Sequence, residues 1–272
     1  MQYEPIKRSV GLFFTGHPFM RKVLYCLLDL LLLRTWHVKR ALRKIAPEFP
    51  GDATVLDAGS GFGQYTWRMS RINDRWKIKA IDINSEHVRD CTRFFNREKL
   101  SGRVVFETGD LTTLADLNTY DIILSVDVME HISEDVKVFG NFYNSLHDKG
   151  ILLISTPSDK GGSDVHNDEE ESFIDEHVRD GYSIEDITEK LSSSGFRSIE
   201  ATYTYGKPGN ISWRLSMKYP IKMLNASKLF FILLPFYYLI FFPVSVILNL
   251  FDLYLTHRTG TGLLVTARKG EK

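Results

Sequence analysis

The residues best suited to chemistry lie in a glycine-rich loop, Asp57-Ala58-Gly59-Ser60-Gly61-Phe62-Gly63, which follows a short apolar run. Glycines let the backbone turn sharply and let a ligand lie against bare main chain, where the first amides of the next helix can face an anion. The dinucleotide-binding fingerprint requires a third glycine three positions after the second, but position 64 is Gln64. The G-x-G-x-G spacing therefore disfavours a nicotinamide dinucleotide as the ligand.

Three polar side chains follow later apolar runs of the chain. Asp82 ends the second run, where a carboxylate can accept hydrogen bonds from both hydroxyls of a ribose. Asp110 ends the third run, where a carboxylate can accept a hydrogen bond from an exocyclic amine, and His131 follows the fourth. Open α/β sheets bind ligands at the carboxyl ends of their parallel strands, so these side chains should meet at one edge.

The elements that must bring these residues together are short apolar strands that alternate with helical spacers. This alternation predicts a parallel sheet covered by helices on both faces. The expected strands are 54–57, 78–83, 104–108, 121–126, 150–155, 198–205 and 262–268. The expected helices are 21–46, 64–72, 85–95, 134–146 and one that begins after the N-cap residue Ser183.

The composition is that of an ordinary globular chain of 272 residues, with 34 basic residues, 34 acidic residues and two cysteines. A net charge of zero argues against nucleic acid as the main partner, because phosphate binding needs an excess of lysine and arginine. Cys26 and Cys91 lie in apolar periodic segments, so we expect buried thiols of a reducing compartment. We expect no metal site.

A resemblance to class I S-adenosylmethionine-dependent methyltransferases rests on five motifs: Asp57–Gly63, Asp82, Gly109-Asp110, the Asp127–His131 run and Gly150-Ile151-Leu152. Within them, Val128-Met129-Glu130-His131 is most similar to the branch that includes quinone-biosynthesis O-methyltransferases. The resemblance covers residues 39–196 and the last strand. It implies a Rossmann-like sheet of seven strands, mostly parallel with an antiparallel last strand, with N-terminal helices and an apolar helical insert between the last two strands.

The same resemblance implies that S-adenosylmethionine is the cofactor. Gly59 and Gly61 would then face its methionine part, Asp82 its ribose and Asp110 its adenine. Val126 would line the adenosine pocket through its main chain. The full set of cofactor residues that we expect is Asp57, Gly59, Gly61, Asp82, Ile83, Asp110, Leu111 and Val126.

Histidines are the candidates for proton transfer. The sulfonium methyl is already activated, so the protein mainly has to align donor and acceptor and exclude water. An acceptor hydroxyl still has a proton to lose, and histidine is the usual base near neutral pH. His131 and His177 are therefore the catalytic candidates, although each could instead be a packing residue. Arg179 and Tyr182, close to His177, could place the substrate.

An apolar insert separates the last two expected strands: residues 229–248 carry no charge, and 207–228 carry five basic and no acidic residues. A helix of 20 residues is about 30 Å long, the thickness of bilayer hydrocarbon. If the flanking strands pair antiparallel, the insert leaves and returns on the same side of a bilayer, which excludes a single crossing. We therefore expect a shallow or re-entrant membrane element, with Trp213, Tyr219 and the basic residues at the headgroups.

The expected domains are an N-terminal helical cap (1–50), a cofactor-binding core (51–206), a membrane-associating insert (207–258) and a last strand with a tail (259–272). The leading hypothesis is methyl transfer, at oxygen, to a hydrophobic or lipid-linked small molecule by a protein on the cytoplasmic face of the membrane. Two alternatives remain: a soluble small-molecule methyltransferase whose insert is a dimer interface, and a catalytically silent S-adenosylmethionine-binding membrane protein. The acceptor and the oligomeric state stay open.

Overall fold

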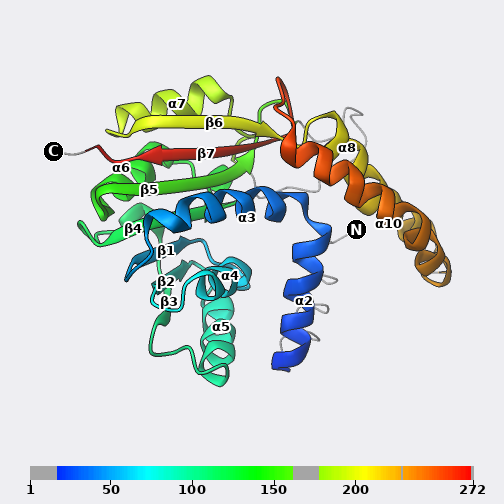
Figure 1. Cartoon of the computed structure of the whole chain (residues 1–272), viewed down its shortest axis with the longest axis horizontal. Coiled ribbons are helices and arrows are strands. Elements are labelled where there is room, and N and C mark those ends of the chain that lie inside the picture. The colour runs from blue at the N-terminus through cyan, green and yellow to red at the C-terminus, as the bar shows by residue number, and fades with distance from the viewer. Residues whose placement is uncertain (1–16, 162–177, 228, 271–272) are drawn as a thin grey trace.

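A computed structural model describes residues 17–161, 178–227 and 229–270. Its centre is one seven-stranded sheet with the order β3-β2-β1-β4-β5-β7-β6 (Figure 1). Strands β1 to β5 pair in parallel, and β7 lies antiparallel between β5 and β6. The predicted Rossmann-like sheet is therefore confirmed. The strands are β1 (Thr54–Ala58), β2 (Lys77–Asp82), β3 (Val104–Thr108), β4 (Tyr120–Val126), β5 (Leu146–Pro157), β6 (Arg197–Thr204) and β7 (Gly262–Arg268).

The strand order reverses between β1 and β4, which are neighbours in the sheet although β2 and β3 lie between them in the sequence. Ligands of open α/β sheets bind at such a reversal, beside the carboxyl ends of the strands. The glycine loop follows β1, and the Asp127–His131 run follows β4. The topology thus places these two motifs side by side.

Helices cover both faces of the sheet. On one face pack α3 (Leu33–Ile45), α4 (Gln64–Ile72) and α5 (Ser85–Arg97), and on the other pack α6 (Asp135–Ser145) and α7 (Ile184–Ser193). The neighbouring residues Val55 and Leu56 of β1 belong to opposite core clusters, and both are fully buried. Burial on both faces explains why apolar residues such as Val55 and Leu56 follow one another directly and do not alternate with polar ones.

Local signals in the sequence determine several boundaries. The predicted N-cap of α7 is confirmed, since the Ser183 hydroxyl accepts a hydrogen bond from the Asp186 amide at 3.0 Å. Asn84 caps α5 in the same way, through the amides of Glu86 and His87. One boundary was misplaced: β5 begins at Leu146, before the expected start at residue 150.

The prediction of a single helix over 21–46 was wrong. Two helices, α2 (Pro18–Leu31) and α3, are separated by Leu32, whose backbone is extended. Because α3 begins anew after this break, the amide of Arg34 in its first turn has no partner within the helix. This amide donates a hydrogen bond to the Tyr205 hydroxyl at 2.9 Å. The break therefore ties the start of α3 to the chain that follows β6.

The two cysteines differ in their surroundings. Cys91 is buried as predicted, and the Arg21 guanidinium donates a hydrogen bond to its sulfur at 3.0 Å. Burial raises the pKa of the Cys91 thiol to about 12, so this residue is an unreactive core thiol. The prediction was wrong for Cys26, which is exposed on the outer side of α2 beside Leu27 and Leu30.

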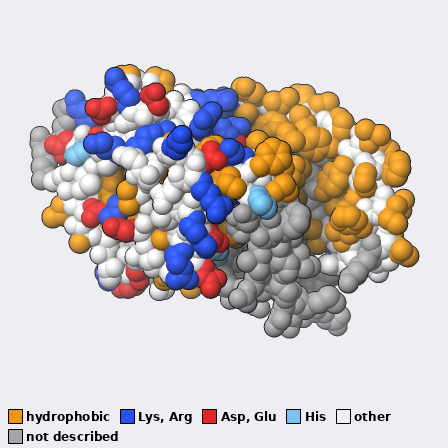
Figure 2. All heavy atoms as spheres, turned by 90° about the horizontal axis from the view of Figure 1, so that it is seen from below, with side chains coloured by type: hydrophobic (Ala, Val, Ile, Leu, Met, Phe, Trp, Pro, Cys, Tyr) orange, Lys and Arg blue, Asp and Glu red, His pale blue; other side chains and the backbone are white. Residues whose placement is uncertain are grey.

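A helical hairpin fills the connection between β6 and β7 and extends away from the sheet (Figure 1). The sequence predicts a helix over the apolar residues 229–248 but not the helical structure of residues 207–226. Within the described residues, one helix, α10, is long and apolar enough to cross a bilayer, yet only 6% of its most apolar stretch is buried. Hydrophobic side chains accordingly cover this end of the molecule (Figure 2). The elements are α8 (Lys207–Trp213), the π-helix η4 (Arg214–Lys218), α9 (Tyr219–Ala226) and α10 (Phe230–Tyr254).

Candidate active site

The glycine loop turns back over the end of β2. The amides of Gly59 and Ser60 both donate to the carbonyl oxygen of Ile81, at 2.8 and 3.0 Å. Gly59 has φ +84°, and a Cβ atom there would lie 2.2 Å from a methyl of Val128, so no other residue fits. Gly61 also has a positive φ, but a Cβ atom on it would meet nothing within 4 Å. The loop thus presents bare backbone to open space on the side of Gly61, as a ligand cradle requires.

Asp82 connects this loop to the helix that follows β2. One carboxylate oxygen accepts the Gly61 amide at 2.6 Å, and the other accepts the Asn84 amide at 2.8 Å. The neighbouring Ile83 is 77% exposed, which leaves apolar surface directly beside the carboxylate. The structure therefore brings Gly61, Asp82 and Ile83 together, with acceptor oxygens next to a surface that can pack against a flat ring.

The remaining predicted cofactor residues lie along the same edge. Because β2 and β3 are paired, Asp110 follows the strand next to Asp82, and its exposed carboxylate accepts the Thr112 amide at 2.8 Å. Val126 ends β4, the neighbour of β1 on the other side. Leu111 differs, since its side chain is buried in the core. A contact between Leu111 and a ligand would have to come from its main chain.

Asp57 lies beneath the loop and is almost inaccessible to solvent. Its carboxylate accepts a hydrogen bond from the Thr66 hydroxyl of α4, which anchors the loop to that helix. Burial raises the pKa of Asp57 to about 7, although the hydrogen bond from Thr66 acts against the rise. Asp57 therefore supports the loop from below and takes up a proton within the physiological range.

This raised pKa predicts a dependence of stability on pH. Between about pH 4 and pH 7 the folded chain keeps a proton on Asp57 that the unfolded chain releases, so the free energy of unfolding should fall as the pH rises. We expect Asp57→Asn to remove this part of the decline. Thermal unfolding at about pH 5 and about pH 7 measures it, with the exposed Asp52→Asn as the control. An equal decline in Asp57→Asn and in the wild type would contradict the assignment.

A short 3-10 helix, Met129–His131, follows β4 and holds two titratable side chains of opposite exposure. His131 is exposed, as an acceptor-facing base must be. Glu130 is 1% exposed and accepts the Thr156 hydroxyl at 3.1 Å, and burial raises its pKa. The sequence interpretation passed over Glu130, although it stands in the same four-residue run. His177, the second predicted base, lies outside the described residues.

Arg34 of α3 reaches the same edge from the N-terminal side, and the sequence interpretation did not include it. Its guanidinium forms an ion pair with Asp127, the first residue after β4. Its buried Nε atom has no hydrogen-bond partner among the described residues. A buried donor without a partner is costly, so this position suits an anionic group of a ligand.

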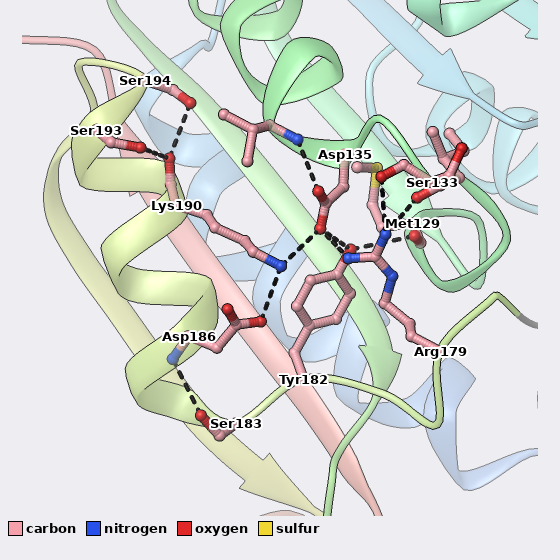
Figure 3. A network of polar contacts seen from close by, with 12 residues as sticks. Met129, Ser133, Asp135, Arg179, Tyr182, Ser183, Asp186, Lys190, Ser193 and Ser194 are labelled. Carbon is pink, nitrogen blue, oxygen red and sulfur yellow. Dashed lines mark hydrogen bonds and ion pairs between the residues drawn. The ribbon is translucent and has the colours of Figure 1, made fainter.

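Arg179 and Tyr182, which were expected to place a substrate, instead support the loop that follows β4 (Figure 3). Tyr182 is fully buried and donates to an Asp135 oxygen at 2.9 Å. Arg179 and Lys190 form ion pairs with the same carboxylate. Burial opposes ionisation of Asp135, but its hydrogen bonds and these cations outweigh that effect and lower its pKa. This network fixes α6 and the segment after β5 around the site.

The arrangement fits a nucleoside with a charged tail. Bare backbone, two carboxylates and exposed apolar surface line one edge, and an unpartnered arginine donor approaches from α3. Sequence comparison agrees with this geometry: residues 51–196 match the protein family described as "Methyltransferase domain".

Two curated proteins illustrate the similarity. Phosphoethanolamine N-methyltransferase 1 of Triticum aestivum is 30% identical over 151 residues, which are 54% of this chain and 29% of that protein. Malonyl-[acyl-carrier protein] O-methyltransferase of Bacillus anthracis is 25% identical over 130 residues, which are 48% of this chain and 47% of that protein. The chain thus spans less than a third of the wheat protein and about half of the bacterial one.

Solved structures show the same fold. Phosphoethanolamine N-methyltransferase 2 of Haemonchus contortus, in complex with S-adenosylhomocysteine, matches 87% of this chain and 53% of its own, with 18% identity and a TM-score of 0.61. A sarcosine dimethylglycine methyltransferase structure from Galdieria sulphuraria matches 88% of this chain and 85% of its own, with 16% identity and a TM-score of 0.58. At these identities the likeness concerns the fold.

Proposed function

The chain belongs to the methyltransferase-domain family, whose methyl donor is S-adenosylmethionine, and we propose that it methylates a hydrophobic or lipid-linked small molecule at a membrane surface. One observation carries the proposal: the exposed apolar hairpin is joined to the edge of the sheet that holds the site. At the base of the hairpin, the Tyr205 hydroxyl accepts a hydrogen bond from the Arg34 amide, and the Arg34 guanidinium forms an ion pair with Asp127. An acceptor dissolved in a bilayer would therefore have only a short distance to the transferable methyl group.

The residues of the site fit the donor. We assign the methionine part to the loop backbone at Gly59 and Gly61, the ribose to Asp82 and the adenine to Asp110. The unpartnered Nε of Arg34 suits the methionine carboxylate, the one anionic group of the donor. The bound donor supplies an activated methyl group on a sulfonium, so the protein has to hold, align and shield the reactants. Supporting contacts would come from Asp57, Ile83, Leu111 and Val126.

We propose an oxygen atom as the acceptor and His131 as the group that removes its proton. The resemblance of the Val128–His131 run to quinone-biosynthesis O-methyltransferases supports oxygen. His131 is exposed in the loop that follows β4, whereas the neighbouring Glu130 is buried and accepts a hydrogen bond from the Thr156 hydroxyl. The names of the relatives mention both nitrogen and oxygen as acceptor atoms, since one is an N-methyltransferase and another an O-methyltransferase.

His131→Ala should lower turnover and leave donor affinity unchanged. General-base catalysis typically contributes 10²- to 10⁴-fold, so we expect kcat to fall by at least about 100-fold. The dissociation constant of S-adenosylhomocysteine, measured by calorimetry, should match that of the wild type. His147→Ala is the matched control, because His147 lies at the start of β5, at the opposite end of the strands from the site. Equal losses of turnover and donor affinity in His131→Ala would count against a base.

Transfer of a labelled methyl group tests the function itself. The full chain is incubated with methyl-labelled S-adenosylmethionine and a cell extract that contains membranes, and the products are partitioned between organic solvent and water. Label in the organic phase supports the proposal. Label in water alone indicates a soluble acceptor and an insert with another role. Absence of label from both phases, with donor binding intact, indicates a catalytically silent protein.

The apolar hairpin also leads us to propose a location, the cytoplasmic face of a membrane, with peripheral or monotopic attachment. Its two ends meet at the base, where the Gly209 amide donates to Asp252 at 3.0 Å. Both ends therefore lie on one side of any bilayer, so the catalytic domain and the hairpin can share one membrane face. Fractionation of cells with and without an alkaline wash would measure this attachment.

A further inference from the structure

The hairpin between β6 and β7 has two arms of opposite character. We call residues 207–226, which comprise α8, η4 and α9, the basic arm, and α10 the apolar arm. The arms run antiparallel and touch at three successive points. The Gly209 amide donates to Asp252, the Ser212 hydroxyl to the Ser245 carbonyl oxygen at 3.0 Å, and the Tyr237 hydroxyl to the Leu215 carbonyl oxygen. The hairpin is therefore two helical arms packed against each other, and each arm has one outer side.

The apolar arm buries polar residues against the basic arm and exposes apolar ones. Ser245, Asn249 and Asp252 are its buried residues, and they mark the side that faces the rest of the protein. The large apolar side chains on the remaining surface of α10 and of the residue on either side of it are 44–75% exposed. All but Phe231 fall within about 160° of the circumference, at about 100° per residue. They are Leu229, Phe231, Ile232, Leu233, Phe236, Leu239, Ile240, Val244, Ile247, Leu250, Phe251, Tyr254 and Leu255.

The basic arm carries cations, not apolar side chains, on its outer side. Its buried residues and its basic residues each recur every four positions. Ser212, Ser216 and Pro220 are buried toward the apolar arm. Arg214, Lys218 and Lys222 are displaced from them by two residues, which is half of the repeat, so the cations lie on the far side of the helix. The wider turn of the π-helix keeps both rows straight. The exposed rings of Trp213 and Tyr219 flank the row of cations.

Two tyrosine hydroxyls of the apolar arm have partners within the hairpin. The hydroxyls of Tyr237 and Tyr238 donate to the carbonyl oxygens of Leu215 and Ser216, both at 2.8 Å. These carbonyls belong to the π-helix, where the backbone departs from regular helical bonding. Backbone groups in hydrocarbon need such internal partners, because no water can replace them. The two tyrosines in the middle of an apolar helix thus have a role that fits a lipid environment.

We propose that the hairpin lies flat in the interface of an anionic bilayer, with the outer side of α10 in the acyl chains and the basic row at the lipid phosphates. The stacking of the arms carries this orientation, since one outer side is apolar and the other is cationic. An upright hairpin would place Lys222 about 22 Å deeper than Lys207, and a charge in the hydrocarbon is strongly disfavoured. When the hairpin lies flat, all of these cations stay at one depth, beside the interfacial Trp213 and Tyr219.

Vesicle binding tests the charge component. The purified full chain is floated with vesicles of phosphatidylcholine alone and of phosphatidylcholine with phosphatidylglycerol. We expect the triple variant Arg214→Gln, Lys218→Gln, Lys222→Gln to bind the anionic vesicles about 100-fold more weakly, at roughly fivefold per basic residue. The control Arg43→Gln, Lys44→Gln, Lys77→Gln removes the same charge from exposed positions outside the hairpin and should bind as the wild type does. Equal binding by both triple variants would overturn the proposal.

Depth measurements test the orientation. Leu233→Cys, Ile240→Cys and Ile247→Cys, each in a Cys26→Ser background, place an environment-sensitive fluorophore at intervals of seven residues along one side of α10. Quenching by lipids labelled at defined depths should give one depth for all three positions, and Lys222→Cys should report a shallower one. A gradient of about 21 Å from Leu233 to Ile247 would show an upright helix and contradict a flat hairpin. Dimers that shield the fluorophores without lipid would contradict it too.

This proposal rests on the proposed function only in placing the protein at a membrane. The depth measurement uses neither methyl donor nor acceptor, so the two proposals can fail separately. A hairpin at uniform depth in a protein that transfers no methyl group would leave the orientation standing and remove the function. Methyl transfer into lipid by a protein with an upright or water-exposed hairpin would support the proposed function and contradict the proposed orientation.

Discussion

Asp82→Ala should weaken the binding of S-adenosylhomocysteine by roughly 10- to 150-fold. The carboxylate accepts the amides of Gly61 and Asn84, at 2.6 and 2.8 Å, and so holds the open part of the glycine loop against α5. Its loss removes the expected acceptor of the ribose hydroxyls and loosens the loop at once. Hydrogen bonds to charged groups typically contribute about 1.5–3 kcal/mol, which corresponds to this range of affinity. Titration calorimetry with the purified chain measures the change.

Two comparisons make this result specific. Asp52→Ala removes a carboxylate just before β1 that is 86% exposed, and it should bind the ligand as the wild type does. A nicotinamide dinucleotide titrated into the wild type should release no heat of binding. If Asp82→Ala bound S-adenosylhomocysteine with unchanged affinity, the assignment of the ribose to this edge would be wrong.

Asp252→Ala should lower the free energy of unfolding by about 3–5 kcal/mol, the range found when one partner of a buried ion pair is removed. Asp252 is fully buried near the end of α10. Its carboxylate pairs with His37 at 2.9 Å and His257 at 3.1 Å, and accepts the amides of Tyr205 and Gly209. Removal leaves these buried donors unpaired and frees the base of the hairpin from α3. Urea unfolding followed by circular dichroism measures the loss.

The size of the change distinguishes this buried contact from an ion pair on the protein surface. Asp252→Asn keeps one acceptor oxygen and the side-chain volume, so its loss should be smaller than that of the alanine variant. Asp186→Ala, at an exposed position of α7, should change stability by less than about 1 kcal/mol. A near-zero change for Asp252→Ala would mean that the hairpin is held by apolar packing alone.

The strands and most helices could be predicted because their signals are local. The consecutive apolar residues of β1 and β4, such as Val55-Leu56 and Ile122-Ile123-Leu124, follow from burial on both faces. Ser183 identifies the start of α7 by its spacing to Asp186. The glycine loop could be recognised for the same reason, since its chemistry is contained in seven consecutive residues.

Features that depend on distant pairs could not be predicted. Arg34 reads as one of many basic residues of an N-terminal helix, and only the fold brings it to Asp127. Asp252 reads as a charge that interrupts an apolar segment, and its partner His37 is 215 positions away. The sequence predicts the basic residues at the lipid headgroups but not their arrangement as a row on one side of a helix. That row can be recognised only when the partner helix α10 is placed against the opposite side.

The hairpin occupies a place in the sheet where chain can be added or removed without disturbing the strand pairing. Thr204 at the end of β6 is paired with Gly262 at the start of β7, and the Thr261 amide donates to the Tyr205 carbonyl oxygen at 3.2 Å. The two chain ends that carry the hairpin are therefore already as close as the ends of a tight turn. Replacing the hairpin with a short turn would therefore leave the pairing of β6 with β7 intact and would remove the contacts that the hairpin makes with α3.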